Sequence, residues 1–312
     1  MTDRARALIC GEALIDVVPD ADGRLQPHPG GGPFNTARAL ARLGVPTAFL
    51  GRLSSDPFGK LLSGQLVTDG VDLSMASWGD EPTTLAVAPL DNGGDATYSF
   101  YVDGTSAPGL TDEMVPAELG AEVAVLHMGT LGLLLEPVAR TLESLAEREC
   151  GRHLLMLDLN IRAVRGADQD AYRARLLRLI AMDALVKASD DDVAWLYPKL
   201  TAEAAADRIL EAGARAALIT LGAKGAFGAT RHCQARACPP EVDVIDTIGA
   251  GDAFGAAVIA WLLEHGSAGA AAVPGSDAEL DAVLRFACEV GALTCTRPGA
   301  DPPWREELTG GR

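Results

Sequence analysis

Short apolar runs that alternate with helix-like segments constrain the fold more than any other feature of this sequence. From residue 123 onward the runs are Val123–His127, Leu154–Leu157, Ala184–Lys187 and Ala216–Thr220. Runs of this length are predicted strands, and continuous apolar character is typical of parallel strands that are buried on both faces. The regular alternation therefore predicts an α/β fold, in which a mostly parallel sheet carries helices on both faces.

The first part of the chain contains the same kinds of element. Ala7–Cys10 and Thr47–Leu50 are predicted strands, and Phe34–Leu43 is a predicted helix that ends at Gly44. Sites in sheets of this class gather at the carboxyl ends of the strands. We therefore expect functional residues in the segments that directly follow the strands.

Two stretches break the alternation of strand and helix. Ile15–Pro29 is interrupted by proline and glycine, whereas Thr83–Val102 alternates in polarity around a turn at Asp91–Gly94. Alternation on both sides of a turn predicts a β-hairpin. These stretches are thus expected to form β-structure outside the main sheet.

Composition narrows the class of partner. The chain has 312 residues, a net charge of -17 and a pI near 4.6, which argue against nucleic acid or an anionic membrane as a partner. Acidic residues interrupt the N-terminus, so no signal peptide is expected, and no apolar run approaches the length of a membrane span. Six scattered cysteines without a C-x-x-C pair fit a reducing cytoplasm. His232, Cys233 and Cys238 are interpreted as incidental neighbours, not as a metal site.

The loop Asp246–Phe254 carries the strongest chemical signal. A β-like run, Glu241–Ile245, precedes it, and a helical run, Ala253–Leu263, follows it. Amide groups in a first helical turn have no partners within the helix, and the helix dipole adds positive potential there. The loop therefore predicts an anion-binding site at the start of a helix.

Four residues of this loop have predicted roles. Gly249, Ala250 and Gly251 would form the anion hole, because small residues let a phosphate approach the backbone. Asp252 lies at its edge and could accept a proton from an attacking hydroxyl. An oxyanion cradle beside a general base is what phosphoryl transfer to an alcohol requires.

A dinucleotide-binding interpretation of the same loop is weaker. Gly249 and Gly251 fit G-x-G, but Phe254 stands where the third glycine should be. The motif also lies late in the chain, which does not favour a nicotinamide-dependent dehydrogenase. No G-x-x-x-x-G-K-[ST] sequence occurs anywhere in the chain.

The pattern D-T-x-G-A-G-D-x-F at residues 246–254 resembles the C-terminal signature of the ribokinase-like (PfkB) carbohydrate kinases, and the resemblance runs through most of the chain. It implies one domain over residues 1–312, built as a three-layer sandwich with a small β lid from segments near 15–30 and 83–103. It further implies an ATP-dependent kinase that uses magnesium ions. Such lids often pair between subunits, so a homodimer is expected.

The resemblance also implies residues for sugar binding. The Asp after the first strand and the G-G-x-x-x-N loop correspond to Asp16, Gly31, Gly32 and Asn35. A polyhydroxy ligand needs several fixed donors and acceptors of this kind. Arg162, in a D-x-N-x-R pattern, is the expected cation near the sugar or the transferred phosphate, with a surface arginine as the alternative.

A second group of residues is implied for ATP and its ions. The T-x-G-x-x-G turn gives Thr220, Gly222 and Gly225 beside the nucleotide phosphates, with Lys224 as a source of charge. Ser189 and Asp192 stand where relatives have N-x-x-E, so Asp192 is expected to reach Mg²⁺ through a water. The alternative, a serine N-cap followed by acids in a first turn, is compatible with that role.

A potassium site is the least specific of these implications. The segment 292–300 resembles one that closes a monovalent-cation site against the Asp246 loop in many relatives, which points to Asp246 and Ile248 as ligands.

Fructose or a related ketose is the first substrate expected, because Lys187-x-Ser189 and the Gly-x-Pro pattern at 31–33 resemble the fructokinase-like branch. Asp103, at the end of the predicted hairpin, suits a neutral polyol and counts against 2-keto-3-deoxygluconate. Ribose, a nucleoside and that sugar acid remain alternatives, as does a sugar-binding regulator without catalytic activity.

Overall fold

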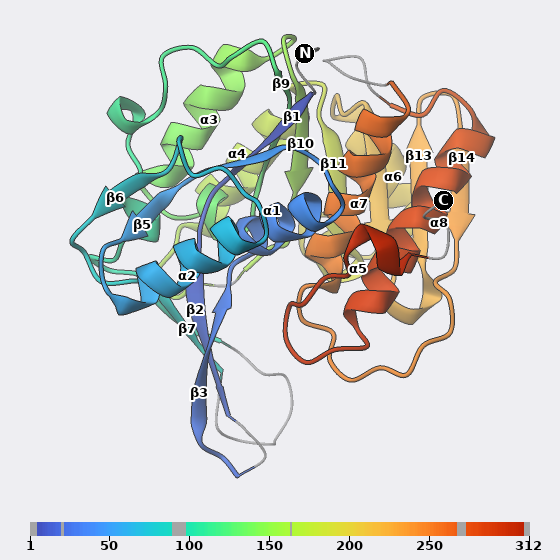
Figure 1. The fold of residues 1–312 in the computed structure, drawn as a ribbon. Coiled ribbons are helices and arrows are strands. Elements are labelled where there is room, and N and C mark those ends of the chain that lie inside the picture. Colours follow the sequence, from blue (N-terminus) through green and yellow to red (C-terminus); the bar gives the residue numbers. More distant parts are fainter. Residues whose placement is uncertain (1–4, 20–21, 89–97, 163, 267–272, 309–312) are drawn as a thin grey trace.

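The central sheet carries the fold and places the site. The computed structural model describes residues 5–19, 22–88, 98–162, 164–266 and 273–308. Among them, eight strands form one sheet in the order β14-β13-β12-β11-β10-β9-β1-β4 (Figure 1). Their bounds are β1 Arg6–Cys10, β4 Thr47–Leu50, β9 Val123–Gly129, β10 Leu154–Asp158, β11 Leu185–Ser189, β12 Ala216–Thr220, β13 Ala226–Thr230 and β14 Gln234–Ala237.

The sheet is parallel from β4 to β12, and β13 and β14 join it as antiparallel strands. All seven residues of β9 and all five residues of β10 are buried. This explains the continuous apolar runs, because both faces of these strands are covered. The predicted strands at 7–10, 47–50, 123–127, 154–157, 184–187 and 216–220 are all present.

Helices cover both faces of the sheet, so the predicted three-layer α/β sandwich is confirmed (Figure 1). The layer with α1, α2, α7 and α8 shares a core with Ile9 and Met156, and the layer with α3, α4, α5 and α6 shares a core with Leu8 and Leu157. The bounds are α1 Gly32–Arg42, α2 Pro57–Thr68, α3 Val138–Glu149, α4 Gln169–Ile180, α5 Asp190–Leu196, α6 Ala202–Glu211, α7 Ala250–Glu264 and α8 Asp277–Thr294. Short 3-10 helices are η1 Ala107–Gly109, η2 Asp112–Met114, η3 Thr130–Leu133, η4 Gly222–Lys224 and η5 Arg305–Glu307.

A separate four-stranded sheet extends away from the sandwich (Figure 1). It has the order β3-β2-β7-β8, with β2 Leu14–Pro19, β3 Leu25–Gly30, β7 Leu85–Val87 and β8 Ser99–Tyr101. The predicted hairpin is confirmed by the antiparallel pairing of β7 with β8, whereas its predicted turn, residues 91–94, lies outside the described residues. A further pair of strands, β5 Arg52–Ser54 and β6 Ser77–Gly79, lies on the main body.

One predicted β-run is wrong. Glu241–Ile245 has no regular secondary structure, although α7 follows it as expected. Val244 and Ile245 are 62% and 65% exposed, so their apolar side chains do not enter the core. Without a neighbouring strand edge or a core to fill, a β-branched run does not become a strand.

None of the helices in the described ranges combines the length and the apolar character that crossing a membrane requires.

A buried ion-pair cluster fastens α1 to the end of the chain. Arg38 Nε donates to Asp69 Oδ2 at 2.6 Å, and Arg42 Nε donates to Asp69 Oδ1 at 3.0 Å. Arg38 Nη1 also donates to the carbonyl of Ala300 at 2.9 Å. Because Ala300 lies directly against Gly249, this cluster supports the predicted anion-binding loop from behind.

We predict that Asp69→Ala destabilises the protein by about 3–5 kcal/mol, because the change leaves two guanidinium groups without their buried partner. The midpoint of urea unfolding measures the effect. Asp281→Asn is the matched control, since it removes an exposed partner of Arg285 and should cost less than about 1 kcal/mol. Equal shifts for the two variants would contradict a structural role for the buried cluster.

Candidate active site

A cavity of about 1930 Å³ opens at the carboxyl ends of the parallel strands. The segments that follow β1, β10, β11 and β12 line it, together with residues of the four-stranded sheet and the start of α7. This is where ligands bind in sheets of this class. Most of the predicted site residues lie on its wall: Asp16, Gly31, Gly32, Asn35, Arg162, Ser189, Thr220, Gly222, Gly225, Ile248, Gly249, Ala250, Gly251 and Asp252.

The start of α7 has the geometry that the loop sequence predicts. Gly249 is the N-cap, with φ at 78°, and a Cβ there would lie 2.6 Å from the Cβ of Ala300. Only glycine tolerates both conditions without strain. The amide of Ala250 makes a long hydrogen bond of 3.3 Å to the carbonyl of Thr247. An anion hole at this turn therefore relies mainly on the amides of Gly251 and Asp252.

Asp252 lies on the floor of the cavity and is only 7% exposed. Its Oδ2 accepts a hydrogen bond of 2.9 Å from Asn35 Nδ2, and its Oδ1 lies 3.5 Å from Asn160 Nδ2. Burial raises the pKa of Asp252, and the neighbouring Lys187, Asn35 and Arg162 oppose that rise only in part. A carboxylate whose pKa is raised toward the working pH is suited to accept a proton.

Asn35 thus has a position that the sequence did not predict. It was expected to face a sugar, and it does line the cavity, but its amide nitrogen is committed to Asp252. Its Oδ1 is buried and has no hydrogen-bond partner within the described structure. The amide therefore orients the carboxylate and keeps one acceptor for a further donor.

The glycines of the 30–32 loop are required by close contacts. A Cβ on Gly32 would lie 2.5 Å from Thr130 Cγ2 and 3.4 Å from Asp252 Oδ1. Gly31 has φ at 107°, and a Cβ there would lie 2.9 Å from the carbonyl oxygen of Glu12. A side chain at position 32 would fill space directly beside Asp252, and one at position 31 would clash with the backbone after β1.

Asp16, in β2, faces the same cavity and is half-buried. Burial raises the pKa of Asp16 to about 7, Asp252 and Glu12 add to the rise, and Arg162 opposes it. Arg162 is exposed and lines the cavity, a position that suits either of its two expected roles, a surface arginine or a cation beside the ligand.

Ser189 and Asp192 form a capping box at the start of α5. Asp192 Oδ2 accepts from the amide of Ser189 at 2.7 Å, and its Oδ1 accepts from the amide of Ile161 at 2.6 Å. The predicted serine N-cap is confirmed. Since both oxygens hold backbone amides and the side chain is buried, the first role of Asp192 is to fix the turn after β10 against α5.

Four predicted residues are not among those that line the cavity: Asp192 and Asp246, whose carboxylates bind backbone amides, and two exposed residues. Asp103 is exposed beyond the end of β8, and Lys224 is exposed within η4. Both predictions assumed that a motif residue faces inward, but the short turns after β8 and β12 direct these side chains to solvent. The neighbouring Thr220, Gly222 and Gly225 do line the cavity, as predicted.

The Asp246 loop and the 292–300 segment meet as the sequence predicts. Asp246 Oδ1 accepts from the amide of Ile248 at 3.0 Å, and its Oδ2 accepts from the amide of Gly299 at 2.8 Å. The amide of Asp246 donates to the carbonyl of Cys295 at 3.2 Å. No group of three or more His, Cys, Asp or Glu side chains in the described residues is arranged to hold a metal.

Several residues of the wall were not assigned from the sequence. Tyr98 and Phe100 contribute stacked rings from the four-stranded sheet, with centroids 6.2 Å apart. Lys187 and Asn160 lie beside Asp252. The sequence does contain a signal for Lys187, because it ends the predicted apolar strand 184–187 and a buried lysine requires a partner or a function.

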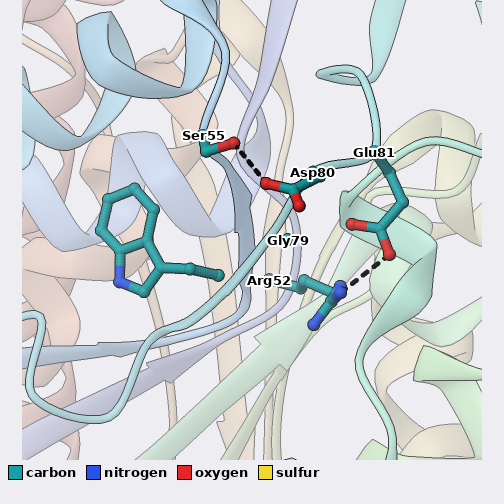
Figure 2. A pocket seen from close by; sticks show the side chains of 6 residues that line it. Arg52, Ser55, Gly79, Asp80 and Glu81 are labelled. Atoms are coloured by element: carbon teal, nitrogen blue, oxygen red, sulfur yellow. Dashed lines mark hydrogen bonds and ion pairs between the residues drawn. The ribbon is translucent and has the colours of Figure 1, made fainter.

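A smaller pocket of about 430 Å³ lies on β5 and β6, away from these residues. Two pairs of its side chains bond to each other: Ser55 Oγ donates to Asp80 at 2.9 Å, and Arg52 donates to Glu81 at 2.7 Å (Figure 2). Among the described residues that line it, the pocket lacks a glycine loop at a helix start and a buried carboxylate like Asp252. The large cavity, with its buried carboxylates and glycine loops, is therefore the candidate active site.

Comparison with known proteins identifies the class. The family model described as pfkB family carbohydrate kinase matches residues 4–307. A fructokinase of Rhizobium leguminosarum bv. trifolii is 39% identical over 259 residues, covering 82% of this chain and 79% of that protein. A fructokinase of Klebsiella pneumoniae is 31% identical over 313 residues, covering 96% and 97%.

Solved structures agree with the sequence relatives. A fructokinase of Xylella fastidiosa with bound ATP has a TM-score of 0.86 at 27% identity, covering 95% of this chain and 94% of that one. A fructokinase of Vibrio cholerae O395 bound to fructose, ADP and a calcium ion has a TM-score of 0.82 at 27% identity, covering 96% and 95%.

The chain belongs to the pfkB family of carbohydrate kinases. The ribokinase-like fold and the ATP-dependent sugar kinase expected from the sequence are thus confirmed, and the dehydrogenase interpretation is not supported.

We predict that Asp16→Asn changes the pH dependence of stability. An Asp with a pKa near 7 in the folded state, and near 4 in the unfolded state, stabilises the fold fully below about pH 4 and loses that contribution as the pH rises through 7. The variant lacks this loss. Its stability relative to the unmodified protein should therefore increase between pH 5 and pH 8, by on the order of 1 kcal/mol after solvent screening.

Urea unfolding at several pH values measures this difference. Asp207→Asn, at an exposed position of α6, is the control for the loss of one carboxylate. A constant difference for Asp16→Asn would show that Asp16 titrates as an ordinary exposed carboxylate.

Proposed function

We propose that this kinase transfers the terminal phosphoryl group of ATP to a hydroxyl of fructose or a related ketose, with Asp252 as the general base. The observation that carries the proposal is the buried Asp252 carboxylate, held by Asn35 at the first turn of α7 and open to the cavity. Geometry and a raised pKa both suit it to take a proton.

The reaction requires one bond to form and one to break. The sugar oxygen bonds to the phosphorus of the terminal phosphoryl group, the bond from that phosphorus to the bridging oxygen of ADP breaks, and the hydroxyl proton passes to Asp252. Charge that develops on the phosphoryl oxygens would be held by the amides of Gly251 and Asp252, supported by the dipole of α7. Removing one such donor typically costs about 10²–10³ in turnover.

Fructose is proposed as the acceptor on two grounds. Relatives that match most of this chain are fructokinases, and a structural neighbour was solved with fructose and ADP bound. The wall also offers what a hexose needs: the carboxylate of Asp16, the guanidinium of Arg162 and the stacked rings of Tyr98 and Phe100. These groups are proposed to bind the sugar, with the 30–32 loop beneath it.

The nucleotide is proposed to lie along Thr220, Gly222 and Gly225, on the other side of the anion hole. Mg²⁺ would arrive with the ATP phosphates and supply charge neutralisation while keeping several waters. Asp192 would act on it through a water, because its side chain is buried and is held in the capping box of α5.

The four-stranded sheet is proposed to act as a lid within a single domain. Its strands place Asp16, Tyr98 and Phe100 over the cavity, so its approach to the main body would exclude water from the reacting groups. Its outer strands, β3 and β8, are edges on which a second copy of the chain could pair, giving the expected homodimer.

We predict that Asp252→Asn lowers turnover of fructose by about 10²–10⁴, because the amide cannot accept the proton. Coupled release of ADP measures the rate across fructose, ribose, other ketoses, sugar acids and nucleosides. Asp207→Asn, with the same charge change at an exposed position, should leave the rate unaltered. Near-normal turnover by Asp252→Asn would rule out its role as the base, and a preferred acceptor other than fructose would refute the substrate.

A monovalent-cation effect is the second prediction for this reaction. Potassium held by Asp246 and the carbonyl of Ile248 would stabilise the loop that leads into α7. Turnover should then be higher in potassium chloride than in choline chloride of the same ionic strength, and Asp246→Asn should reduce the difference. Equal rates in the two salts would show that potassium does not activate the enzyme.

A further inference from the structure

A lysine is buried directly beneath the proposed anion hole. Lys187, the middle residue of β11, is 3% exposed, and its Nζ donates to both carboxylate oxygens of Asp158 at 3.0 Å. A Cβ built on Gly251 would lie 2.9 Å from the same Nζ. The ammonium group is therefore placed between Asp158 on β10 and the first turn of α7, and it forms part of the cavity wall.

The surroundings keep Lys187 protonated. Burial lowers the pKa of the ammonium group, but Asp158, Asp192 and Asp252 outweigh burial and raise it above the ordinary value for lysine. The same attraction acts on Asp252, whose pKa would be higher without Lys187. A positive charge thus persists at this point through the neutral pH range.

Pairing with Asp158 does not by itself account for a lysine here. An ammonium group has three donors, and the two oxygens of Asp158 account for two of them. A buried ion pair is no more stabilising than well-packed apolar side chains of similar volume. The ion pair is therefore best explained by function: the third N–H of Lys187 is left to donate to a ligand beside Gly251.

The charges of the cavity support this use. Among the described residues that line it, Lys187 and Arg162 are the basic side chains, against the carboxylates of Glu12, Asp16 and Asp252 as well as others nearer the rim. Arg162 is exposed, whereas Lys187 is desolvated, and a desolvated charge interacts more strongly with a phosphate. Lys224, the cation expected from the sequence, does not reach the described wall.

We propose that Lys187 is a phosphate-binding residue of the active site, held by Asp158 so that its ammonium group donates to the transferring phosphoryl group beside Gly251. Asp158 is then a positioning residue, which acts through Lys187. The inference rests on the proposed kinase reaction and adds to it the cation that works with the α7 amides. Charge-assisted hydrogen bonds of this kind are about twice as strong as neutral ones.

Three variants separate this role from a structural one. Lys187→Met removes the ammonium group and leaves Asp158 unpaired, Asp158→Asn weakens the hold on Lys187, and the double variant removes both charges together. The double variant is the matched control, because it leaves no uncompensated buried charge. Thermal melting and ADP affinity show whether each variant keeps an intact pocket.

The first readout is turnover with fructose. Both Lys187→Met and the double variant should lose about 10²–10³, the range for one lost oxyanion donor. The acid limb of the kcat/KM profile should also move to higher pH in both, because Lys187 no longer lowers the pKa of Asp252. Recovery of the double variant to within about threefold of the unmodified rate would overturn the proposal, since Lys187 would then only neutralise Asp158.

The second readout needs no sugar and is independent of the proposed acceptor. Calorimetry compares the affinities of the unmodified protein and the double variant for magnesium ATP and magnesium ADP. The double variant should lose at least about tenfold, or 1.4 kcal/mol, more affinity for ATP than for ADP. Equal losses would overturn the role of Lys187 even if fructose is phosphorylated. If the unmodified protein phosphorylates no sugar, the proposed function is refuted. The comparison of ATP and ADP affinities would still decide whether Lys187 binds the terminal phosphate.

Discussion

The hydrogen bond between Asn35 and Asp252 joins the two loops on which the site depends. The two residues are 217 positions apart in sequence, at the starts of α1 and α7, and their side chains meet at 2.9 Å beneath the cavity. Their helices lie side by side over one face of the sheet (Figure 1). This contact fixes the carboxylate relative to the 30–32 loop, while Arg38 and Ala300 support Gly249 from behind.

The electrostatic problem of the site is the concentration of negative charge. Burial raises the pKa of Glu12 and of Asp252, and a nucleotide adds further negative charge to an already acidic protein. The structure offers two sources of compensation at the same point, the first-turn amides of α7 and the ammonium group of Lys187. Each is fixed before a ligand arrives, so little reorganisation is needed during the reaction.

The sequence predicted the sandwich and the residues around Asp252 because these features are local. Apolar runs mark strands that are covered on both faces, and the glycines at 31, 32 and 249 are required by close contacts or positive φ. Side-chain direction in short turns is not local. The orientations of Asp103 and Lys224 depend on where the chain goes next, and the apolar side chains of Glu241–Ile245 found no core to enter.

Residues that act through tertiary neighbours were equally hard to predict. Lys187 and Asp158 lie on adjacent strands, and only their register, which pairs Asp158 with Lys187, shows that they meet. The commitment of Asn35 to Asp252 instead of to solvent likewise needs the packing of α1 against α7. A motif identifies which residues are present at a site, whereas packing decides which of them touch.

The central claim is that Asp252 takes the proton from the acceptor hydroxyl at the start of α7. A crystal structure with fructose and a non-hydrolysable ATP analogue tests it most directly. The account predicts one sugar hydroxyl within about 2.6–3.2 Å of an Asp252 carboxylate oxygen, with the terminal phosphate beside the amides of Gly251 and Asp252. A hydroxyl in line with that phosphate but bound to Asp16 or another carboxylate, with Asp252 out of reach, would contradict it.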